Sequence, residues 1–271
     1  MTHLRDVAEQ LAAEAAEFVR VRRAEVFADR DPVAGAVRAK STPTDPVTVV
    51  DTETERWLRD RLAVLRPGEH VLGEEEGGRE DGRDGLSWVI DPIDGTVNFV
   101  YGIPAYAVSV AVQRDGKSVA GAVADVAAGI VYSAATGCGA RVRDAAGDTS
   151  VIRCNRLGEL GMALVGTGFS YEPEQRRQQA RVLAQILPVV RDVRRIGSCA
   201  LDLCMVAAGR LDAYFEDGVH VWDWAAGALI AAEAGARVWL PGTVGPGQIA
   251  ASAPGIAPAL AAALAGAGVD L

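Results

Sequence analysis

The stretch Trp88-Val89-Ile90-Asp91-Pro92-Ile93-Asp94-Gly95-Thr96 is the part of the chain that decides the fold. Its first three residues are apolar and β-prone, and such a run predicts a short buried strand. Pro92 has no backbone N–H to donate, so we expect the strand ladder to end just after Asp91. The pattern therefore predicts two carboxylates, Asp91 and Asp94, held close together at the end of a rigid strand.

The two residues after this pair predict the start of a helix. Gly95 tolerates backbone torsions that other residues resist, and Thr96 suits the N-cap of a helix. Two unpaired carboxylates about 4 Å apart would repel by about 4 kcal/mol at an effective dielectric near 20. A bound cation would remove that repulsion, whereas two solvated aspartates in a surface turn would need none. Whether the pair binds a cation or is a solvated surface turn depends on the other acidic residues of the chain.

The composition is that of an ordinary globular protein. The chain has 271 residues, enough for one large domain or two tightly joined halves, with 49% hydrophobic and 23% charged residues. Its net charge of −9 argues against a general nucleic-acid binder, which would carry a basic stripe. An anionic substrate would need bound cations to reverse the field at the site.

The cysteines and the N-terminus predict a cytoplasmic protein with reduced thiols. The four cysteines (Cys138, Cys154, Cys199 and Cys204) form no C-x-x-C pair and lack the density of a secreted scaffold. The N-terminus has no basic start followed by an apolar core, so we expect no signal peptide. The Ala-rich stretch 225–236 is too short to span a bilayer and contains Glu233, so we expect no membrane partner.

The first half of the chain predicts a mostly antiparallel sheet with helices. We expect Asp51 or Thr52 to cap the second helix and Asp115-Gly116 to form a hairpin turn. A polar, Gly-rich loop covers 79–86, and a hairpin around Gly147 ends this half near residue 153. The expected helices cover 4–28, about 51–65 and 96–101, with extended segments over 47–50, 88–91, 106–112, 119–126 and 130–133.

The second half alternates strands and helices, which favours a layered sheet. A Pro/Gly-rich loop over 241–247 precedes the last helix, which begins at about residue 256. The expected strands cover 162–166, 194–196, 213–216 and 237–240, and the expected helices 174–187, 199–208 and 223–234.

Four further acidic residues are candidate metal ligands: Glu74, Asp51, Glu216 and Asp223. Taken alone, Asp223 could be an N-cap, and Glu74 could belong to a solvated acidic turn. The histidines and cysteines are not clustered, so the available ligands are oxygens. Oxygen ligands of this kind indicate magnesium, with manganese as the alternative, rather than zinc.

Several motifs resemble those of the inositol monophosphatase family, and they occur in the same order. The resemblance covers roughly residues 40 to 240 and looks closest to the bacterial inositol-1-phosphatases. The motifs are Asp45–Asp51, Gly73-Glu74-Glu75, Trp88–Phe99, Arg195–Asp202 and Val221–Gly227.

The resemblance implies an α+β fold, a layered αβαβα sandwich of the inositol monophosphatase and sugar phosphatase type. One catalytic domain would cover 1–271. Its N-terminal half, 1–153, would hold the large antiparallel sheet and the metal site, and 154–271 would close the pocket. The family likeness also implies a homodimer and magnesium-dependent, lithium-sensitive hydrolysis of inositol 1-phosphate by a metal-activated water.

The resemblance assigns roles to individual residues. One magnesium ion would be bound by Glu74, Asp91 and the backbone carbonyl of Ile93. A second would be shared by Asp91, Asp94 and Asp223. Asp51 and Thr96 match the pair that activates water, and Glu74 can orient a metal-bound water. Lys40 matches a basic residue on the mobile flap. The expected substrate contacts are Glu74, Ile93, Asp94, Gly95, Thr96, Gly197, Ser198, Cys199, Glu216 and Asp223, with the phosphate on the N–H groups of Gly95 and Thr96.

Three alternatives remain. A haloacid-dehalogenase type has a D-x-D-G-T motif and a nucleophilic aspartate, but here the carboxylates are three positions apart with Pro92 between them. Within the family, histidinol phosphate, fructose 1,6-bisphosphate or an adenosine bisphosphate could replace inositol phosphate, although Glu216 suits a polyol. The third alternative is a non-catalytic regulatory relative. The carboxylates at all the matched metal-ligand positions are intact, which argues against this alternative.

Two residues near these motifs have simple interpretations. We expect Cys199 to form a wall of the pocket, with an oxidation-sensitive thiol as the alternative. We expect His220 to support the site or lie on the surface rather than bind a metal.

Overall fold

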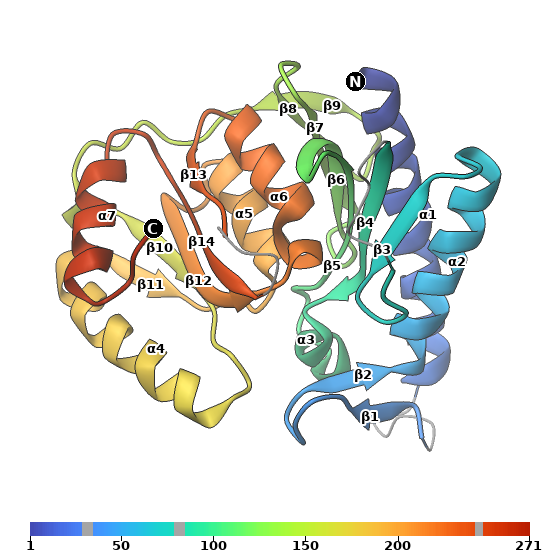
Figure 1. The fold of residues 1–271 in the computed structure, drawn as a ribbon, viewed down its shortest axis with the longest axis horizontal. Coiled ribbons are helices and arrows are strands. Elements are labelled where there is room, and N and C mark those ends of the chain that lie inside the picture. Colours follow the sequence, from blue (N-terminus) through green and yellow to red (C-terminus); the bar gives the residue numbers. More distant parts are fainter. Residues whose placement is uncertain (29–34, 79–84, 242–245) are drawn as a thin grey trace.

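The computed structural model describes residues 1–28, 35–78, 85–241 and 246–271. Most of the loop expected over 79–86 therefore lies outside the described residues. Two sheets and the helices around them form five layers, α-β-α-β-α, as expected (Figure 1). Among the described residues, no helix has the length and apolar character needed to cross a membrane.

The larger sheet has seven strands in the order β3-β4-β5-β6-β7-β8-β9. Only β3 runs parallel to its neighbour β4, and the other neighbours are antiparallel, which confirms the mostly antiparallel first half. The strands are β3 (His70–Gly73), β4 (Leu86–Asp94), β5 (Ala107–Arg114), β6 (Lys117–Asp125), β7 (Ile130–Ala135), β8 (Ala140–Arg143) and β9 (Thr149–Ile152).

The central strand β4 does not end at Pro92, so that prediction was wrong. Asp91 pairs with Ser109 and Asp94 with Ala107, so two residues of β4 oppose a single residue of β5. This is a β-bulge, and a proline fits there because the bulged residue needs no ladder hydrogen bond. Side chains three positions apart normally point to opposite faces of a strand. The extra residue reverses that alternation, so Asp91 and Asp94 project from the same side.

The outer helical layer on this sheet consists of α1 (Thr2–Val26) and α2 (Val49–Leu65). Both bury an apolar stripe, with Leu11 and Leu58 fully enclosed, against β4, β5 and β6. Helix α2 begins earlier than expected. Its N-cap is Thr48, whose backbone N–H donates to Asp51 Oδ2 at 2.9 Å, so neither Asp51 nor Thr52 caps this helix.

The short helix α3 (Thr96–Tyr101) follows β4 directly. Its N-cap is Gly95 rather than Thr96, with φ at +99°. A Cβ at this position would lie 3.0 Å from the carbonyl oxygens of both Ala105 and Gly197. Glycine is therefore needed both for the torsion and for the close approach of the second half of the chain.

The middle layer consists of α5 (Cys199–Ala207) and α6 (Val221–Glu233), which pack between the two sheets. Helix α5 ends before Gly209, as predicted. Helix α6 begins two residues before the expected start, so Asp223 lies in its first turn and not at its N-cap. Figure 1 shows both helices side by side between β14 and β6, and Cys204 of α5 is completely buried in this layer.

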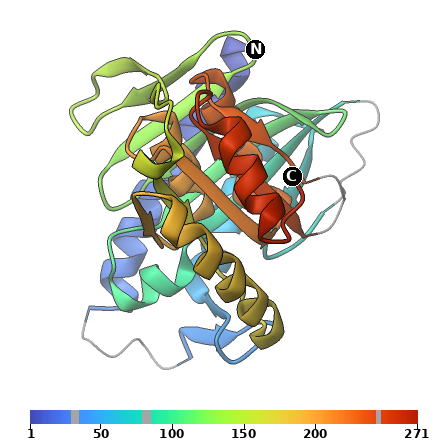
Figure 2. The ribbon, with the colours of Figure 1, turned by 90° about the vertical axis from the view of Figure 1, so that its left-hand side faces the viewer.

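The smaller sheet has the order β11-β10-β12-β14-β13, covered on its outer face by α4 (Pro173–Ile186) and α7 (Ala257–Gly266) (Figure 2). Strand β14 was not predicted, because its Ala-rich segment carries a weak β signal. Strand β11 ends at Arg194, so the strand expected over 194–196 was misplaced. The strands are β10 (Leu164–Thr167), β11 (Asp192–Arg194), β12 (Ala213–Val219), β13 (Arg237–Trp239) and β14 (Gly247–Ser252).

A separate hairpin of β1 (Val37–Ala39) and β2 (Pro46–Thr48) lies beside α3. The extended segment expected over 47–50 therefore ends at Thr48, where helix α2 takes over. Lys40 follows β1, and its backbone N–H donates to Asp45 O at 2.7 Å. The hairpin thus holds Lys40 in the loop that joins its two strands.

Candidate active site

A cavity of about 530 Å³ opens where the end of β4 meets the second half of the chain. Its wall includes the starts of α3, α5 and α6 and the end of β12. The expected site residues that line it are Lys40, Glu74, Asp91, Ile93, Asp94, Gly95, Thr96, Gly197, Cys199, Glu216 and Asp223. Asp51 and Ser198 are buried behind this wall and are joined to it by hydrogen bonds. The structure therefore brings every expected site residue to one place.

Three carboxylates converge at the centre of the cavity. Asp91, Asp94 and Asp223 each offer an oxygen atom, and these three oxygens lie within 4.8 Å of one another. Asp91 and Asp94 come from the bulge of β4, and Asp223 comes from the first turn of α6. Residues separated by more than a hundred positions thus form one acidic cluster able to bind a metal ion.

The cluster is electrostatically unfavourable as a set of three bare anions. Burial raises the pKa of the Asp91 carboxyl well above its ordinary value, and Glu74 and Asp94 raise it further. Burial also raises the pKa of Asp223, with Asp94 as the next cause. The pKa of Asp94 rises to about 7, chiefly through burial, although hydrogen bonds from Ser198 and Ala200 oppose the rise. A cation among the three would favour their charged forms.

Backbone and hydroxyl donors fix the orientation of each carboxylate. Asp94 Oδ2 accepts from Ser198 Oγ at 2.7 Å and from Ala200 N at 2.6 Å, both at the start of α5. Asp91 Oδ1 accepts from the N–H of Ile93 at 3.0 Å inside the bulge. Asp223 Oδ2 accepts from His220 N at 2.6 Å. One oxygen of each residue is held by the protein, so the cluster is preorganised.

A second group lies next to the cluster and joins helix α2 to the bulge. Thr96 Oγ1 lies 3.0 Å from Asp51 Oδ1 and 3.0 Å from the carbonyl oxygen of Ile93. The other oxygen of Asp51 accepts from the backbone N–H and the hydroxyl of Thr48. Burial raises the pKa of Asp51 to about 6, even though the bonds from Thr48 oppose the change. A carboxylate with such a pKa can accept a proton near neutral pH.

Glu74 faces the cavity from the corner after β3, beside the hairpin loop. Its Oε1 accepts from Lys40 Nζ at 2.8 Å, and Lys40 also contacts Glu75 Oε1 at 2.5 Å. Burial would lower the pKa of Lys40, but Glu74 and Glu75 raise it above its ordinary value. Burial and the charge of Glu74 raise the pKa of Glu75 to about 7. Lys40 therefore supplies a positive charge next to the acidic cluster.

Another part of the cavity wall is built around Glu216 on β12, whose charge also raises the pKa of Asp94 and Asp223. Tyr214 OH donates to Glu216 Oε2 at 2.5 Å. Burial raises the pKa of Glu216, while this bond and the charge of Arg195 oppose the rise. Burial also raises the pKa of the Cys199 thiol well above its ordinary range. Reactive cysteines need a lowered pKa, so Cys199 fits a pocket wall rather than an oxidation-sensitive thiol.

His220 and Trp222 lie at the rim of the cavity. Their rings stack with centroids 4.6 Å apart and an interplanar angle of 7°. The backbone N–H of His220 holds Asp223, so the residue supports the acidic cluster, as expected for a residue beside a ligand.

Sequence reasoning missed three residues that shape the site. Glu55 of α2 is fully buried and accepts from the backbone N–H groups of Glu75 and Glu76 at 2.7 and 2.9 Å, which fixes the corner that carries Glu74. Tyr214 holds Glu216, and a Cβ on Gly168 would lie 1.9 Å from Glu216 Oε2. The pairing of Glu55 with Arg59 one turn later was visible in the sequence, but its burial was not.

The residues present fit divalent cations that prefer oxygen ligands. The donors around the cluster are carboxylates, and the carbonyl of Ile93 lies on the same bulge. Burial and mutual repulsion raise the pKa values of Asp91, Asp94 and Asp223, and the charge of Lys40 only partly offsets the rise at Asp91. Such a site is suited to magnesium or manganese.

Comparisons with known proteins identify the family of this chain. Residues 1–266 match the model of the inositol monophosphatase family. The chain is 68% identical over 271 residues to an inositol-1-monophosphatase of Mycobacterium leprae, across 96% of this chain and 93% of that protein. The solved structure of Mycobacterium tuberculosis SuhB superposes with a TM-score of 0.84 at 62% identity, covering 98% of this chain and 97% of that one. A Vibrio cholerae protein named Nus factor SuhB is 41% identical over 196 residues, across 72% of this chain and 71% of that protein.

The family model matches nearly the whole chain, and the solved structure covers 98% of it. This chain therefore belongs to the inositol monophosphatase family, a family of phosphatases.

Proposed function

We propose that this protein hydrolyses inositol 1-phosphate to inositol and phosphate with the help of magnesium ions, or of manganese in their place. The observation that carries the proposal is the convergence of Asp91, Asp94 and Asp223 in a cavity that also holds Glu216. The acidic cluster suits metal ions and a phosphate. The carboxylate of Glu216, on the same cavity wall, can accept hydrogen bonds from the hydroxyls of a polyol.

The ligand assignment follows the family resemblance. Glu74, Asp91 and the carbonyl of Ile93 would hold one ion, and Asp91, Asp94 and Asp223 a second. Bound magnesium would lower the pKa of water and offset the charge of the phosphate and the departing alkoxide. Phosphoryl transfer depends mainly on positioning and charge neutralisation, so no covalent residue is needed.

The residues of the chain supply the proton transfer. Thr96 Oγ1 can pass its proton to Asp51 Oδ1, 3.0 Å away, while taking one from a water placed at the cavity side. The pKa of Asp51, about 6, suits a base that works near neutral pH. Glu74 lines the same cavity and can orient that water.

Substrate binding divides between the two halves of the chain. The backbone N–H groups of Gly95 and Thr96 would face the phosphate, and Gly197, Ser198, Cys199 and Glu216 the inositol ring. The residues 1–153 and 154–271 would therefore act as one catalytic domain, since neither half contains the whole cavity. A homodimer and lithium inhibition stay predictions that rest on the family resemblance.

A comparison of substrates tests the proposal. We expect kcat/KM to be highest for inositol 1-phosphate when it is measured beside histidinol phosphate, fructose 1,6-bisphosphate and an adenosine bisphosphate. Chelation should abolish phosphate release, and added magnesium should restore it. Full activity after exhaustive chelation would overturn the proposal, and a preference for another substrate would correct its specificity.

A regulatory role is the second candidate function. It is favoured by one observation, the likeness to a protein named Nus factor SuhB. Catalysis in this chain is favoured by the intact acidic cluster, in which a backbone N–H group fixes one oxygen of each carboxylate. Absence of phosphate release from all four substrates in the presence of magnesium would favour the regulatory role.

A further inference from the structure

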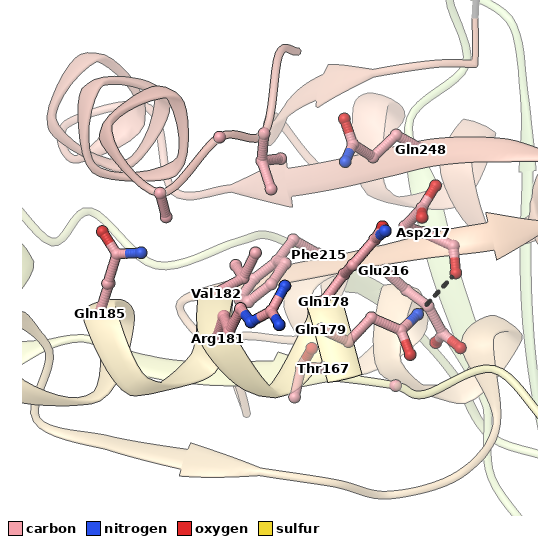
Figure 3. Close-up of a pocket in the computed structure, with 14 residues that line it drawn as sticks. Thr167, Gln178, Gln179, Arg181, Val182, Gln185, Phe215, Glu216, Asp217 and Gln248 are labelled. Carbon is pink, nitrogen blue, oxygen red and sulfur yellow. Dashed lines mark hydrogen bonds between the residues drawn. The ribbon is translucent and has the colours of Figure 1, made fainter. Parts of the chain in front are cut away.

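A second cavity, of about 410 Å³, lies on the other face of the smaller sheet (Figure 3). Helix α4 forms one wall, strands β12 and β14 form the floor, and the residues after α7 close one side. Only Ile186 of the fourteen residues of α4 is buried, so this helix stands away from the sheet. The volume falls within the range of about 300–1,000 Å³ that is typical of small-molecule sites.

Amide side chains dominate the polar part of the lining. Gln178, Gln179 and Gln185 come from α4, and Gln248 comes from β14. In the described part of the chain, the side chains of Gln178 and Gln185, which are exposed, and of Gln248, which is half-buried, make no hydrogen bond to the protein. An amide offers both donors and acceptors, as a hydroxyl group does. These amides therefore match a ligand with several hydroxyls.

The charges in the cavity do not select an ion. Arg181 lines it together with Glu216 and Asp217, so an anion would meet two carboxylates and a cation the guanidinium. Figure 3 shows Arg181 and Val182 pointing from α4 toward the strand that carries Phe215 and Asp217. Phe215 and Val269 are buried members of the apolar cluster beneath the cavity, and Val182 packs against it. An apolar floor suits the C–H face of a sugar or cyclitol ring.

The cavity is also connected to the active site. Gln179 Nε2 donates to the carbonyl oxygen of Asp217 at 3.1 Å (Figure 3), and its Oε1 accepts from Ser170 N at 2.9 Å. Ser170 belongs to the loop that lines the active-site cavity. Glu216 and Asp217 are adjacent on β12 and contribute to the lining of both cavities. A ligand that competes for Gln179 would therefore act on the active-site wall.

We propose that this cavity is a second ligand site, which takes an uncharged polyhydroxylated ring and is coupled to the active site through Gln179. The ring is either a cyclitol or a hexose, because both present several hydroxyls on a six-membered ring to amide side chains. The binding itself does not depend on the proposed function. The coupling does, because it acts on the binding of the phosphate substrate.

The distribution of glutamines provides a test of binding. The chain has seven glutamines: four line this cavity, Gln175 lines the active site, and Gln10 and Gln113 lie elsewhere. The whole protein, labelled with [¹⁵N]glutamine, is titrated in separate experiments with myo-inositol and with glucose, and the side-chain amide signals are followed by NMR. We expect the four cavity signals to shift along one saturation curve with at least one probe, while those of Gln10 and Gln113 stay fixed.

Three outcomes would overturn the proposed site: no shift at tens of millimolar of either probe, a shift of Gln175 without the four cavity signals, or uniform shifts of all seven. Binding of myo-inositol alone would identify a cyclitol site, and binding of glucose alone a hexose site. Glucuronate tests the charge argument. We expect it to bind no more tightly than glucose, and tenfold tighter binding would contradict an uncharged ligand.

Two variants test whether the ring binds in this cavity. Gln178→Ala should weaken binding of the effective probe about fivefold, the loss expected for one neutral hydrogen bond. Arg177→Ala is the matched control, because Arg177 is an exposed residue of the same helix that does not line the cavity, and it should leave affinity unchanged. Equal losses in both variants would contradict the site.

The coupling is measured with a saturating ring that is not the expected product: glucose where glucose binds, or scyllo-inositol where only the cyclitol probe binds. We expect at least a twofold change in KM for inositol 1-phosphate in the wild-type protein and none in Gln179→Ala. If the ring binds by NMR but the KM of the wild-type protein is unchanged, the proposed coupling is wrong and the proposed ligand site still stands. A protein that binds the ring but releases no phosphate would instead overturn the proposed function.

Discussion

The two cavities on either side of β12 differ in how their polar groups are held. In the active-site cavity, Asp91, Asp94 and Asp223 each have one oxygen fixed by a protein donor. In the second cavity, Gln178 and Gln248 are unpaired within the described residues. Buried charges require fixed partners, whereas amides near solvent can exchange partners with water at little cost. The first arrangement suits metal ions and fixed reaction geometry, and the second suits weak, reversible binding.

The two cavities also differ in which parts of the chain line them. The active-site cavity combines residues of both halves, from Lys40 to Asp223. The second cavity uses only residues from 167 to 269, so it belongs to the smaller sheet alone. A substitution of a residue that lines only the first cavity should therefore affect catalysis strongly. Substitution of Gln178, Gln185 or Gln248, which line only the second cavity, should affect only ligand binding there and its coupling. The following predictions test this contrast, beginning with the largest expected effect.

Asp94→Asn should reduce turnover by about 10²–10³-fold or more, because it removes one charge from the cluster that would hold the cations. The amide keeps the size of the side chain, so the fold should remain. Phosphate release from inositol 1-phosphate measures the effect, and circular dichroism checks the fold. Asp60→Asn, at an exposed position on α2, is the matched control. Persistent turnover in Asp94→Asn would contradict the proposed metal site.

The pH dependence of metal binding gives the next effect. The pKa values of about 7 for Asp94 and about 6 for Asp51 lie above those of the unfolded chain, so the metal-free folded state binds more protons there. Its stability should therefore fall as pH rises from about 4 to 7. Magnesium bound at the cluster would displace the proton of Asp94. Its affinity should therefore rise with pH over the upper part of that window, by up to about tenfold per pH unit for each proton released.

Thermal unfolding with and without magnesium measures this dependence. The increase in Tm caused by magnesium should be small at pH 5.5 and larger at pH 7.5. Asp94→Asn should make it less dependent on pH. A magnesium effect that is the same at both pH values would contradict the proton competition.

Much of this site could be predicted from the sequence, because its ligands lie in motifs whose order and spacing are specific. The proximity of Asp91 and Asp94 followed from their short separation after a buried strand. Their common direction did not, because it depends on a bulge whose register is set by pairing with Ser109 and Ala107 of β5. Strand β14 was missed because Ala250 and Ala251 become strand residues through their pairing with β12 and β13.

The supporting residues could not be predicted for a similar reason. Glu55 is a fully buried carboxylate on a helix whose charges looked solvated, and only the fold places it beside Gly73. Gly168 leaves room for Glu216, which lies 48 positions later in the sequence. Such roles arise from tertiary contacts, which local pattern and propensity do not contain.

Gly168→Ala should displace Glu216, because the new Cβ would lie 1.9 Å from its Oε2. A flexible side chain can move, so the fold should remain while KM for inositol 1-phosphate rises by about tenfold, as expected for a lost charged hydrogen bond. Gly158→Ala is the control, because its Cβ would meet nothing within 4 Å. An unchanged KM would show that Glu216 does not contact the ring.

Tyr214→Phe should give the smallest effect of the four. It removes the hydroxyl that donates to Glu216 Oε2 at 2.5 Å and keeps the buried ring. Loss of one hydrogen bond predicts about a fivefold rise in KM for inositol 1-phosphate, because Glu216 would lose its fixed orientation. Phenyl phosphate has no ring hydroxyls, so its KM should stay unchanged. Tyr132→Phe removes a hydroxyl from the same apolar layer, outside the cavity lining, and serves as the control. Equal changes for both substrates would mean that Tyr214 only supports the fold, whereas a change confined to the inositol ester would mean that it positions the carboxylate.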